Sequence, residues 1–427
     1  MLERPPTGER SLLVHIGYGR PCHADETQEF EALADSAGAD IVGELYAQRS
    51  RPDARFFMGS GKVDELAKLV ADSGAELVLV NRALSASQER NLERELQTRV
   101  LDRNGLILDI FAQRAASFEG KLQVELAQLE HLSTRLIRGW THLERQKGGI
   151  GLRGPGETQL ETDRRLLGKR IRHLKDRLER VERRRETGRK ERVRSEIPTV
   201  ALVGYTNAGK TTLFNVLTGA RLEARDQLFA TLDPTVRRLP LDGGDEVLLA
   251  DTVGFVRDLP HELVAAFRAT LTEARDAALL LHVIDASDPH HVDRMAQVEA
   301  VLEEIGAGEV PRIQVYNKID LAPNDAYREL RDRSSSNVSV SAVSGEGIPA
   351  LREAIRDRAV GDRVTGRVKL GPEQSRVRAK LFDWQAVRAE EPDPAGGWTL
   401  DVELTAQRWR ELCKREGLSG ADVSRKV

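Results

Sequence analysis

Short apolar runs alternate with amphipathic stretches between residues 11 and 118. The runs SLLVHIG, DIVGELY and AELVLV are typical of short buried strands, because they are apolar and rich in Leu, Ile and Val. The stretches EFEALADSAG, GKVDELAKLVADSG and SASQERNLEREL have the apolar spacing of helices. Strands that alternate with helices predict a small parallel α/β domain, to which we assign residues 1–118.

A seven-residue repeat replaces this alternation in residues 121–147 and 158–187. Its positions are Leu122, Leu126, Leu129, Ser133, Leu136, Trp140 and Leu143, and then Leu160, Leu167, Ile171, Leu174, Leu178 and Val181. Two such seams separated by a short break predict an antiparallel helical-hairpin arm over residues 119–196. Helices of about 25 residues, rising about 1.5 Å per residue, project about 35–40 Å. The glycine-rich stretch GGIGLRGPGE, residues 148–157, then forms the tip of the arm.

Two further domains follow the arm. Strand and helix patterns alternate again over residues 197–362, as expected of a second α/β domain. In residues 363–427 the stretches RVRAKLFDW and GWTLDVELT are interpreted as strands and AQRWRELCKREG as a helix, so we predict a small C-terminal α+β domain.

A phosphate-binding loop follows the apolar strand at 197–203. Residues 204–211, GYTNAGKT, match G-x-x-x-x-G-K-[ST] in the required context between a strand and a helix. In this motif backbone N–H groups wrap the phosphates, Lys210 reaches the β- and γ-phosphates, and the Thr211 hydroxyl ligates Mg²⁺. The stretch Gly59-Ser60-Gly61-Lys62 lacks the first glycine and the final hydroxyl, so we interpret it as the first turn of a helix.

Three more motifs follow in the order expected of a GTP-binding domain. They are Asp251-Thr252-Val253-Gly254, Asn317-Lys318-Ile319-Asp320 and Ser341-Ala342. Asp251 can hold Mg²⁺ through water, the Gly254 N–H can approach the γ-phosphate, and the Asp320 carboxylate can accept two hydrogen bonds that only guanine donates. We therefore predict a P-loop GTPase domain whose nucleotide-binding residues are Gly204, Tyr205, Thr206, Asn207, Ala208, Gly209, Lys210, Thr211, Thr212, Asp251, Gly254, Asn317, Lys318, Asp320, Ser341 and Ala342.

The segment LFATLDPT, residues 228–235, has the character of a switch that senses the γ-phosphate. Thr231 and Thr235 can each supply the hydroxyl that ligates Mg²⁺, and we prefer Thr231. Phe255 stands where Ras-like GTPases place the glutamine that orients water, so intrinsic hydrolysis should be slow. Asn207 either helps to hold K⁺ near the β/γ-bridging oxygen or only closes the loop. We therefore predict Lys210, Asn207 and Thr231 as the catalytic residues.

Charge is distributed unevenly along the chain. The net charge is only -3, yet residues 121–197 contain 21 Lys or Arg and 12 Asp or Glu, a net charge of +9. A basic arm on an otherwise acidic chain favours a polyanionic partner such as RNA over a merely solvated helix face. The candidate RNA contacts are Arg153, Gly154, Pro155, Arg183, Arg184 and Arg185.

Composition also limits where the protein acts. The two cysteines, Cys22 and Cys413, have no metal-binding or redox spacing, which is typical of reduced thiols. An apolar run of 18 residues and the apolar core of a signal peptide are both absent from the sequence. We predict a cytoplasmic monomer without a membrane span, for which peripheral membrane association stays open.

Several longer stretches together resemble the HflX family, within the Obg/HflX group of GTPases. They are FMGSGKVDEL at 56–65, GGIGLRGPGETQLETDRR at 148–165, LFATLDPT at 228–235 and DTVGFVRDLP at 251–260, and the resemblance covers about residues 10–360. It implies the four domains described above and binding to the large (50S) ribosomal subunit and its rRNA. It further implies that the GTP-bound form splits stalled or stress-inactivated ribosomes, with the arm tip near the peptidyl-transferase region. Thr211 and Thr231 are the implied Mg²⁺ ligands.

Two other functions fit the same residues. A GTP-dependent rRNA or ribosome assembly factor would use the arm on free or immature RNA. A signalling switch without RNA would use the arm to recruit a protein. RNA binding weakens steeply as salt rises, and this dependence separates the first two functions from the third.

Overall fold

The computed structural model describes most of the 427-residue chain. The described residues are 9–139, 155–194, 197–220, 228–229, 231, 233–242, 244–257, 268–322, 337–360, 363–384, 386–393, 396–405, 409, 412–413 and 423–425. None of the helices in these ranges is both long enough and apolar enough to cross a lipid bilayer. Two compact units divide the chain, the first made of residues 1–188, 225–233 and 253–271, and the second of the remainder.

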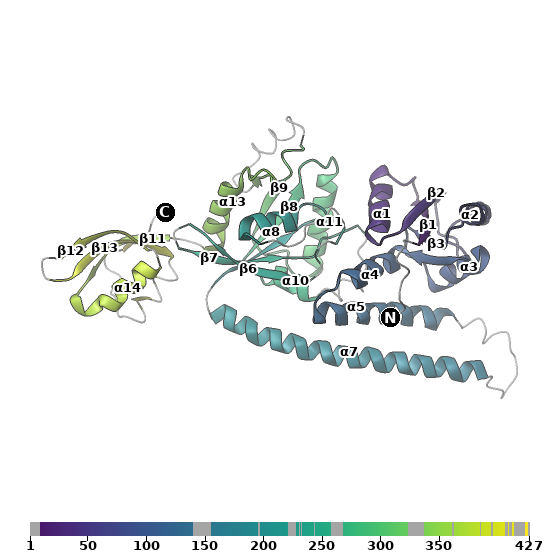
Figure 1. The fold of residues 1–427 in the computed structure, drawn as a ribbon, viewed down its shortest axis with the longest axis horizontal. Helices are drawn as coiled ribbons and strands as arrows, with labels where there is room; N and C mark the ends of the chain where they lie inside the picture. The colour runs from purple at the N-terminus through teal and green to yellow at the C-terminus, as the bar shows by residue number, and fades with distance from the viewer. Residues whose placement is uncertain are drawn as a thin grey trace. The chain divides into compact units, whose positions relative to one another are not determined.

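The N-terminal domain is a small parallel α/β layer (Figure 1). Its four strands pair in the order β2-β1-β3-β4, with all neighbours parallel. The elements are β1 Arg10–Tyr18, α1 Ala24–Ser36, β2 Asp40–Arg49, α2 Ser60–Ser73, β3 Leu77–Val80, α3 Ala86–Leu96, β4 Arg99–Asp102 and α4 Arg103–Arg114. The predicted parallel domain is confirmed. Gly59 precedes α2, so the first-turn interpretation of residues 59–62 is confirmed as well.

The arm consists of α5, Phe118–Gly139, and α7, Pro155–Arg194, which lie side by side (Figure 1). Leu122 packs against Leu174 and Leu178, and all three are buried, as the heptad pattern predicts. Arg170 Nε donates to Glu125 across the two helices at 2.9 Å. The 40 residues of α7 make it about 60 Å long at 1.5 Å per residue.

A six-stranded sheet forms the centre of the second α/β domain. Its order is β10-β9-β8-β5-β7-β6, and only β6 runs antiparallel to its neighbour. The elements are β5 Thr199–Val203, α8 Lys210–Thr218, β6 Thr235–Pro240, β7 Glu246–Asp251, α10 Arg268–Arg275, β8 Leu279–Asp285, α11 His291–Glu304, β9 Arg312–Asn317, β10 Asn337–Ser339 and α13 Ile348–Ile355, followed by a π-helical turn, Arg356–Val360.

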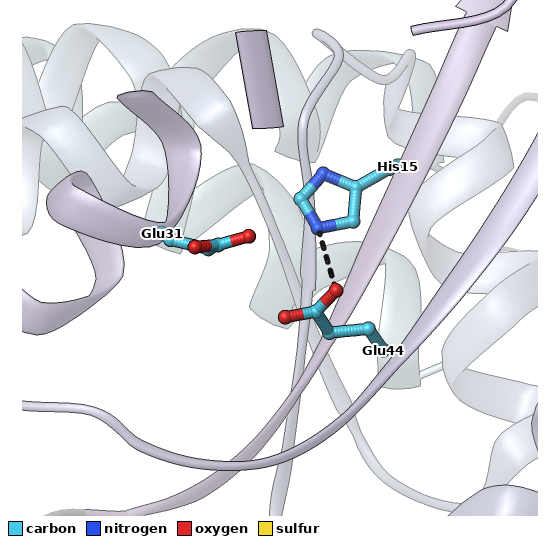
Figure 2. Close-up of side chains that lie close together, drawn as sticks. All are labelled: His15, Glu31 and Glu44. Atoms are coloured by element: carbon cyan, nitrogen blue, oxygen red, sulfur yellow. Dashed lines mark ion pairs between the residues drawn. The ribbon is translucent and has the colours of Figure 1, made fainter. Parts of the chain in front are cut away.

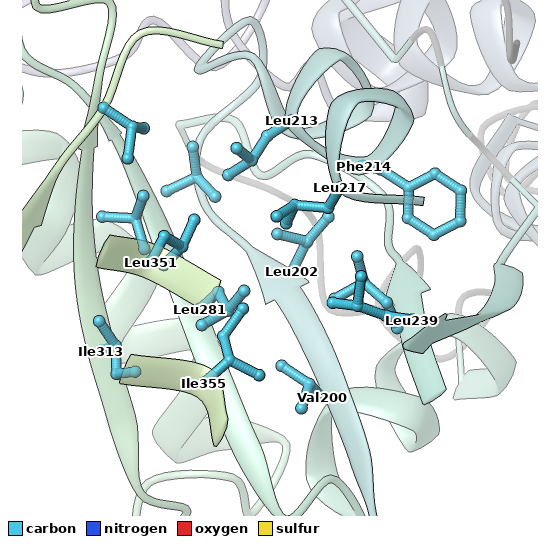
Figure 3. Packing of buried hydrophobic residues seen from close by; sticks show 14 of the residues in the cluster. Val200, Leu202, Leu213, Phe214, Leu217, Leu239, Leu281, Ile313, Leu351 and Ile355 are labelled. Atoms are coloured by element: carbon cyan, nitrogen blue, oxygen red, sulfur yellow. The ribbon is translucent and has the colours of Figure 1, made fainter. Parts of the chain in front are cut away.

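The core of this domain lies between the sheet and two helices (Figure 3). Leu213 and Leu217 reach the sheet from α8, and Leu351 and Ile355 reach it from α13. Leu202 of β5 lies among them, and each of these side chains is at most 4% exposed. The central strand β5 is therefore fixed in place, and so is the loop that leaves its carboxyl end.

The C-terminal domain is a separate antiparallel sheet with the order β12-β13-β11-β14. Its elements are β11 Arg363–Leu370, a short 3₁₀ helix Pro372–Gln374, α14 Ser375–Asp383, β12 Val387–Pro392, β13 Trp398–Thr405 and β14 Val423–Arg425. The predicted strand at 397–405 is confirmed as β13. The predicted helix at 406–417 lies outside the described residues, apart from helical residues at 409 and 412–413.

The predicted strand RVRAKLFDW, residues 376–384, is wrong, because this stretch forms α14. Its apolar residues Val377, Ala379 and Leu381 alternate with basic ones, which imitates a strand. Val377 and Leu381 are also four residues apart, and both are buried in the core of the domain. Burial of this one helical face decides the conformation.

Candidate nucleotide-binding site

The phosphate-binding loop lies where β5 ends and α8 begins. Lys210 is the first residue of α8, and its side chain folds back into the loop. Lys210 Nζ donates to the carbonyl oxygens of Gly204 at 3.1 Å and Tyr205 at 2.7 Å. An ammonium group inside the loop and a helix N-terminus behind it together form a site for negatively charged phosphates.

Two glycines of the loop pass close to neighbouring strands. Gly204 has φ +149°, and a Cβ there would lie 2.3 Å from the Val283 carbonyl oxygen. Gly209 has φ +89°, and a Cβ there would lie 2.2 Å from Asn317 Nδ2. Packing therefore requires glycine at both positions, independently of the close approach to phosphate.

Lys210 is buried, and its charge depends on what surrounds it. Burial lowers the pKa of Lys210 to about 8, and nearby Lys318 lowers it too, whereas Asp251 opposes the shift. A phosphate group in the loop would favour the charged form of Lys210. Nucleotide binding should therefore raise the pKa of this lysine.

Thr211 and Asp251 meet at the point where a metal ion would bind beside the phosphates. Thr211 Oγ1 donates to Asp251 Oδ2 at 2.9 Å, although the two residues come from α8 and the end of β7. A hydroxyl and a carboxylate are oxygen donors that suit Mg²⁺. These two residues would hold the ion, which in GTPases neutralises charge on the β- and γ-phosphate oxygens.

Asn317 joins the loop that reads the base to the loop that wraps the phosphates. Its Nδ2 donates to the Ala208 carbonyl oxygen at 2.9 Å, and its Oδ1 accepts from the Ala342 N–H at 3.0 Å. The side chain of Asn317 is 2% exposed, so both bonds are shielded from water. The structure thus brings together three of the predicted motifs around one buried amide.

Lys318 and Asp320 flank the place where the base is expected. Lys318 has φ +62°, and its Nζ lies 2.8 Å from Asp285 Oδ2 at the end of β8. Asp320 is exposed in the turn after β9, as a residue that receives a base should be. Asp285 was not among the predicted site residues, although it ends the apolar strand LLLHVID beside the motif.

The remaining residues of the second unit that were predicted to bind nucleotide differ in exposure. Thr206 is buried, whereas Asn207 is exposed with φ +60° and Thr212 is half-buried. Ser341 is fully buried, and its Oγ accepts from the Ser344 N–H at 3.1 Å. The backbone at Asn207 turns sharply, which fits either of the two roles considered for its side chain.

The residues expected to sense the γ-phosphate belong to the first unit. Thr231 is half-buried and Gly254 is buried, and their roles toward the phosphate stay predictions. Phe255 is 1% exposed, so its ring is part of a core. A buried hydrocarbon ring has no polar atom with which to orient water, which supports slow intrinsic hydrolysis.

The predicted RNA contacts are only partly described. Arg153 and Gly154 lie outside the described residues. Pro155 is the first residue of α7, and Arg183 is exposed on the same helix. Arg184 and Arg185 belong to α7, but their side chains lie outside the description. Their contacts with RNA stay predictions.

Asp233, between the two candidate switch threonines, makes contacts that the sequence did not predict. Its Oδ2 accepts from the Ala116 N–H at 2.9 Å and the Ser117 N–H at 2.7 Å, and its Oδ1 accepts a short bond from Ser117 Oγ. Ser117 directly precedes α5 and caps it, because its Oγ accepts from the Gly120 N–H at 2.9 Å. Asp233 therefore anchors the cap of the first helix of the arm from a distant part of the chain, and its negative charge lies near the N-terminus of that helix. The serine before an amphipathic helix was the available signal.

The segment after Asp251 is also anchored within the first unit. Arg257 Nη1 lies 2.7 Å from Glu26, and Arg257 Nη2 lies 2.9 Å from Asp25. Arg103 donates to the Arg257 carbonyl oxygen at 3.0 Å. These partners belong to α1 and the start of α4. The segment around Thr231 and the segment after Asp251, which are both predicted to respond to the γ-phosphate, are therefore anchored to other elements of the first unit.

These features together define a P-loop GTPase. The six-stranded sheet carries a loop suited to bind phosphates, a threonine and an aspartate placed for Mg²⁺, and a base-reading loop that is hydrogen-bonded to the phosphate loop. Four family models match in succession, described as GTP-binding GTPase N-terminal at 24–112, GTP-binding GTPase Middle Region at 114–192, 50S ribosome-binding GTPase at 199–318 and HflX C-terminal domain at 328–425. The chain is 53% identical to GTPase HflX of Escherichia coli (strain K12) over 418 residues, 97% of this chain and 98% of that protein. The chain belongs to the HflX family of GTPases.

Other relatives agree with this assignment. GTPase HflX of Magnetococcus marinus is 49% identical over 335 residues, which are 78% of this chain and 77% of that protein. Among solved structures, a GTP-binding protein from the archaeon Sulfolobus solfataricus in complex with GDP is 25% identical, with a TM-score of 0.45 over 82% of this chain and 98% of that one. The family models and the two GTPase HflX relatives confirm the resemblance drawn from the sequence, and GTP hydrolysis follows from the family.

Proposed function

We propose that this GTPase binds the large ribosomal subunit and, in its GTP-bound state, dissociates stalled or stress-inactivated ribosomes, with hydrolysis releasing it. The observation that carries the proposal is that Asp233 anchors Ser117, the N-cap residue of α5. Asp233 lies two residues after Thr231, the preferred switch ligand of Mg²⁺. A movement of the switch segment toward the γ-phosphate would therefore act directly on the first turn of the arm.

The surface of the arm supports an RNA partner. The exposed charged side chains described on α7 between 162 and 183 are mostly basic, namely Arg164, Arg165, Lys169, Arg170, Arg172, Lys175, Arg180 and Arg183. Only Asp176 and Glu179 are acidic among the exposed residues described there. A basic helix about 60 Å long can contact many phosphates, and each contact releases counterions from the nucleic acid, which favours binding at low salt. The family model described as 50S ribosome-binding GTPase supports the same partner.

Replacing GDP by GTP would shift the equilibrium between two conformations of the protein. GTP must favour the arm position that separates the subunits over the GDP position by a few kcal/mol, about 5 kcal/mol for a nearly complete change. The hydroxyl of Thr231 would supply this preference, because a switch threonine ligates Mg²⁺ only in the state that holds the γ-phosphate. Hydrolysis removes that partner and returns the arm.

The test is a dissociation assay with purified 70S ribosomes. Light scattering should fall when the chain is added with GTP or a non-hydrolysable analogue, and should stay constant with GDP. Lys210→Ala should be inactive in the same assay, because tight nucleotide binding is lost. A chain that binds 70S ribosomes equally with GTP and GDP, and leaves them intact, would contradict the proposal.

A second part of the experiment tests the tip of the helical arm. Residues 148–157 are replaced with a two-residue turn, which we expect to retain intrinsic hydrolysis but to lose stimulation by 50S subunits. Sedimentation with ribosomes at rising salt should show a steep loss of binding. Binding to free rRNA without dissociation of 70S would instead support an assembly factor. Binding that is insensitive to salt and RNase would support a protein partner.

A further inference from the structure

Three potential metal ligands converge in the N-terminal domain, away from the nucleotide-binding residues in sequence. His15 belongs to β1, Glu31 to α1 and Glu44 to β2. Figure 2 shows the carboxylates of Glu31 and Glu44 facing the same edge of the His15 ring. One ligand atom from each of the three residues lies within 4.8 Å of the other two. His15 Nε2 and Glu44 Oε2 are 3.9 Å apart.

His15 has no hydrogen bond, although its side chain is completely buried. Neither ring nitrogen has a hydrogen-bond partner, and the exposed fraction of the side chain is 0%. The ring is held in place by Tyr46, stacked on it at 4.9 Å, and by the edge of Phe30 at 5.7 Å. A buried polar atom without a partner is unfavourable, so a bound group that accepts the Nε2 lone pair would relieve a cost already present in the fold.

The two carboxylates reinforce this interpretation. Burial, followed by the negative charge of Glu44, raises the pKa of Glu31, so the two acidic groups compete for ionisation. A cation between them would remove that competition. Tyr46 Oη donates to Glu44 Oε2 at 2.6 Å, which is the type of outer hydrogen bond that orients a carboxylate ligand.

We propose that His15, Glu31 and Glu44 form a binding site for one divalent first-row transition-metal ion. Bonds of about 2.0–2.2 Å allow ligand atoms to be up to about 4.4 Å apart, so small side-chain rotations bring all three into range. An imidazole nitrogen favours transition metals over Mg²⁺ and Ca²⁺, and two carboxylates exclude a soft site for Cu(I). Glu44 is 32% exposed, which leaves an entry path and room for water ligands.

Such an ion would join α1 to the paired strands β1 and β2. β1 and β2 are neighbours in the sheet, and α1 contacts β2 on the same side as the cluster. The site is therefore a structural one, which stabilises the N-terminal domain when metal is bound. It is independent of the proposed ribosomal function and of the Mg²⁺ that accompanies GTP.

The test is Co²⁺ titration of the full-length chain after treatment with a chelator, followed by visible absorption and calorimetry. GDP and excess Mg²⁺ are present throughout, so that metal binding at the nucleotide does not contribute. We expect one equivalent of Co²⁺ to bind, and Zn²⁺ to displace it. The melting temperature of the chain should rise as the metal concentration exceeds its Kd.

Glu31→Gln and Glu44→Gln are the informative variants, because these side chains lie nearer the surface than His15 and their replacement should not disturb folding. Each should weaken Co²⁺ binding at least about tenfold. Glu76→Gln, an exposed change in the same domain, is the matched control and should bind normally. Circular dichroism and GDP affinity check that each variant is folded. Absence of Co²⁺ binding, or equal binding by all four proteins, would overturn the proposal and leave His15 as a buried aromatic residue of the core.

Discussion

Removing the Asp233 carboxylate should loosen the first turn of α5. In Asp233→Ala the Ala116 and Ser117 N–H groups lose the acceptors that they contact at 2.9 and 2.7 Å, and Ser117 Oγ loses a third contact. Loss of a charged acceptor that anchors the N-cap residue at a helix N-terminus should cost about 2 kcal/mol, the upper end of the range for helix caps. Local opening of the turn should then become about 30-fold more frequent.

Amide hydrogen exchange measures this opening directly. The relevant reporters are Gly120, whose N–H donates to Ser117 Oγ at 2.9 Å, and Lys121, whose N–H donates to the Ser117 carbonyl oxygen at 3.0 Å. Both should exchange faster in Asp233→Ala. The ratio of 50S-stimulated to intrinsic GTP hydrolysis should fall in the same variant, because the switch segment no longer holds the arm.

Two further variants separate the contributions of Asp233 and Ser117. Asp233→Asn keeps an acceptor oxygen and loses the charge, so about half the change is expected. Ser117→Ala keeps both backbone contacts with Asp233 but removes the hydroxyl that accepts from the Gly120 N–H, so Gly120 should exchange faster in this variant too. If Gly120 and Lys121 exchange at wild-type rates in Asp233→Ala, the cap does not stabilise the arm. If exchange accelerates while ribosomal stimulation is unchanged, the cap is structural and the proposed path from nucleotide to arm is wrong.

Three further predictions concern the GTPase domain. Asp320→Asn should reduce the preference for GTP over ATP, because one of the two acceptor oxygens for guanine is lost. Competition binding of the two nucleotides measures this preference. An unchanged preference would mean that other residues recognise guanine. Hydrolysis should be faster in K⁺ than in Na⁺, and Asn207→Ala should abolish the difference if that side chain helps to hold the ion. Burial, followed by the charges of Arg312 and Lys210, lowers the pKa of His282 to about 4. The folded state therefore binds a proton at His282 less readily than the unfolded state does. The free energy of unfolding should accordingly fall as the pH drops below about 6.5. The loss at pH 5 should be about 2 kcal/mol in denaturant unfolding, and should be absent in His282→Gln; equal losses in both proteins would contradict the sign of the shift.

Local patterns predicted the elements whose burial is continuous along the chain. Strand β1 is buried except at its two ends and β3 is buried throughout, as expected of inner strands of a parallel sheet, and the motifs at 204–211 and 317–320 occupy strand ends in the order of the fold. The stretch at 376–384 misled because its basic residues alternate with apolar ones, whereas the burial of Val377 and Leu381 against the domain core is a tertiary effect. Strand β6 escaped notice because it is a polar edge strand.

Contacts between distant residues were beyond the reach of local patterns. Asp233 and Ser117 are separated by 116 positions, and neither belongs to a spacing rule that links them. The cluster of His15, Glu31 and Glu44 likewise depends on the parallel pairing of β1 and β2, which aligns His15 with Tyr46 and therefore brings Glu44 to the same edge. Local sequence patterns do not predict such contacts, because the residues become neighbours only when the sheet is assembled.

The bonds of Asn317 make the base-reading and phosphate-binding loops one rigid frame. Ala208 and Ala342 are fixed to the same buried amide, and the absence of a Cβ at Gly209 leaves the space that this amide occupies. The conformational entropy of these loops is therefore lost during folding and not on binding, so a guanine nucleotide binds to a preformed site. GDP and GTP should fit this site alike, so discrimination between them falls to the segments outside it, at 228–235 and after Asp251. The chain thus separates the holding of a nucleotide from the reading of its last phosphate.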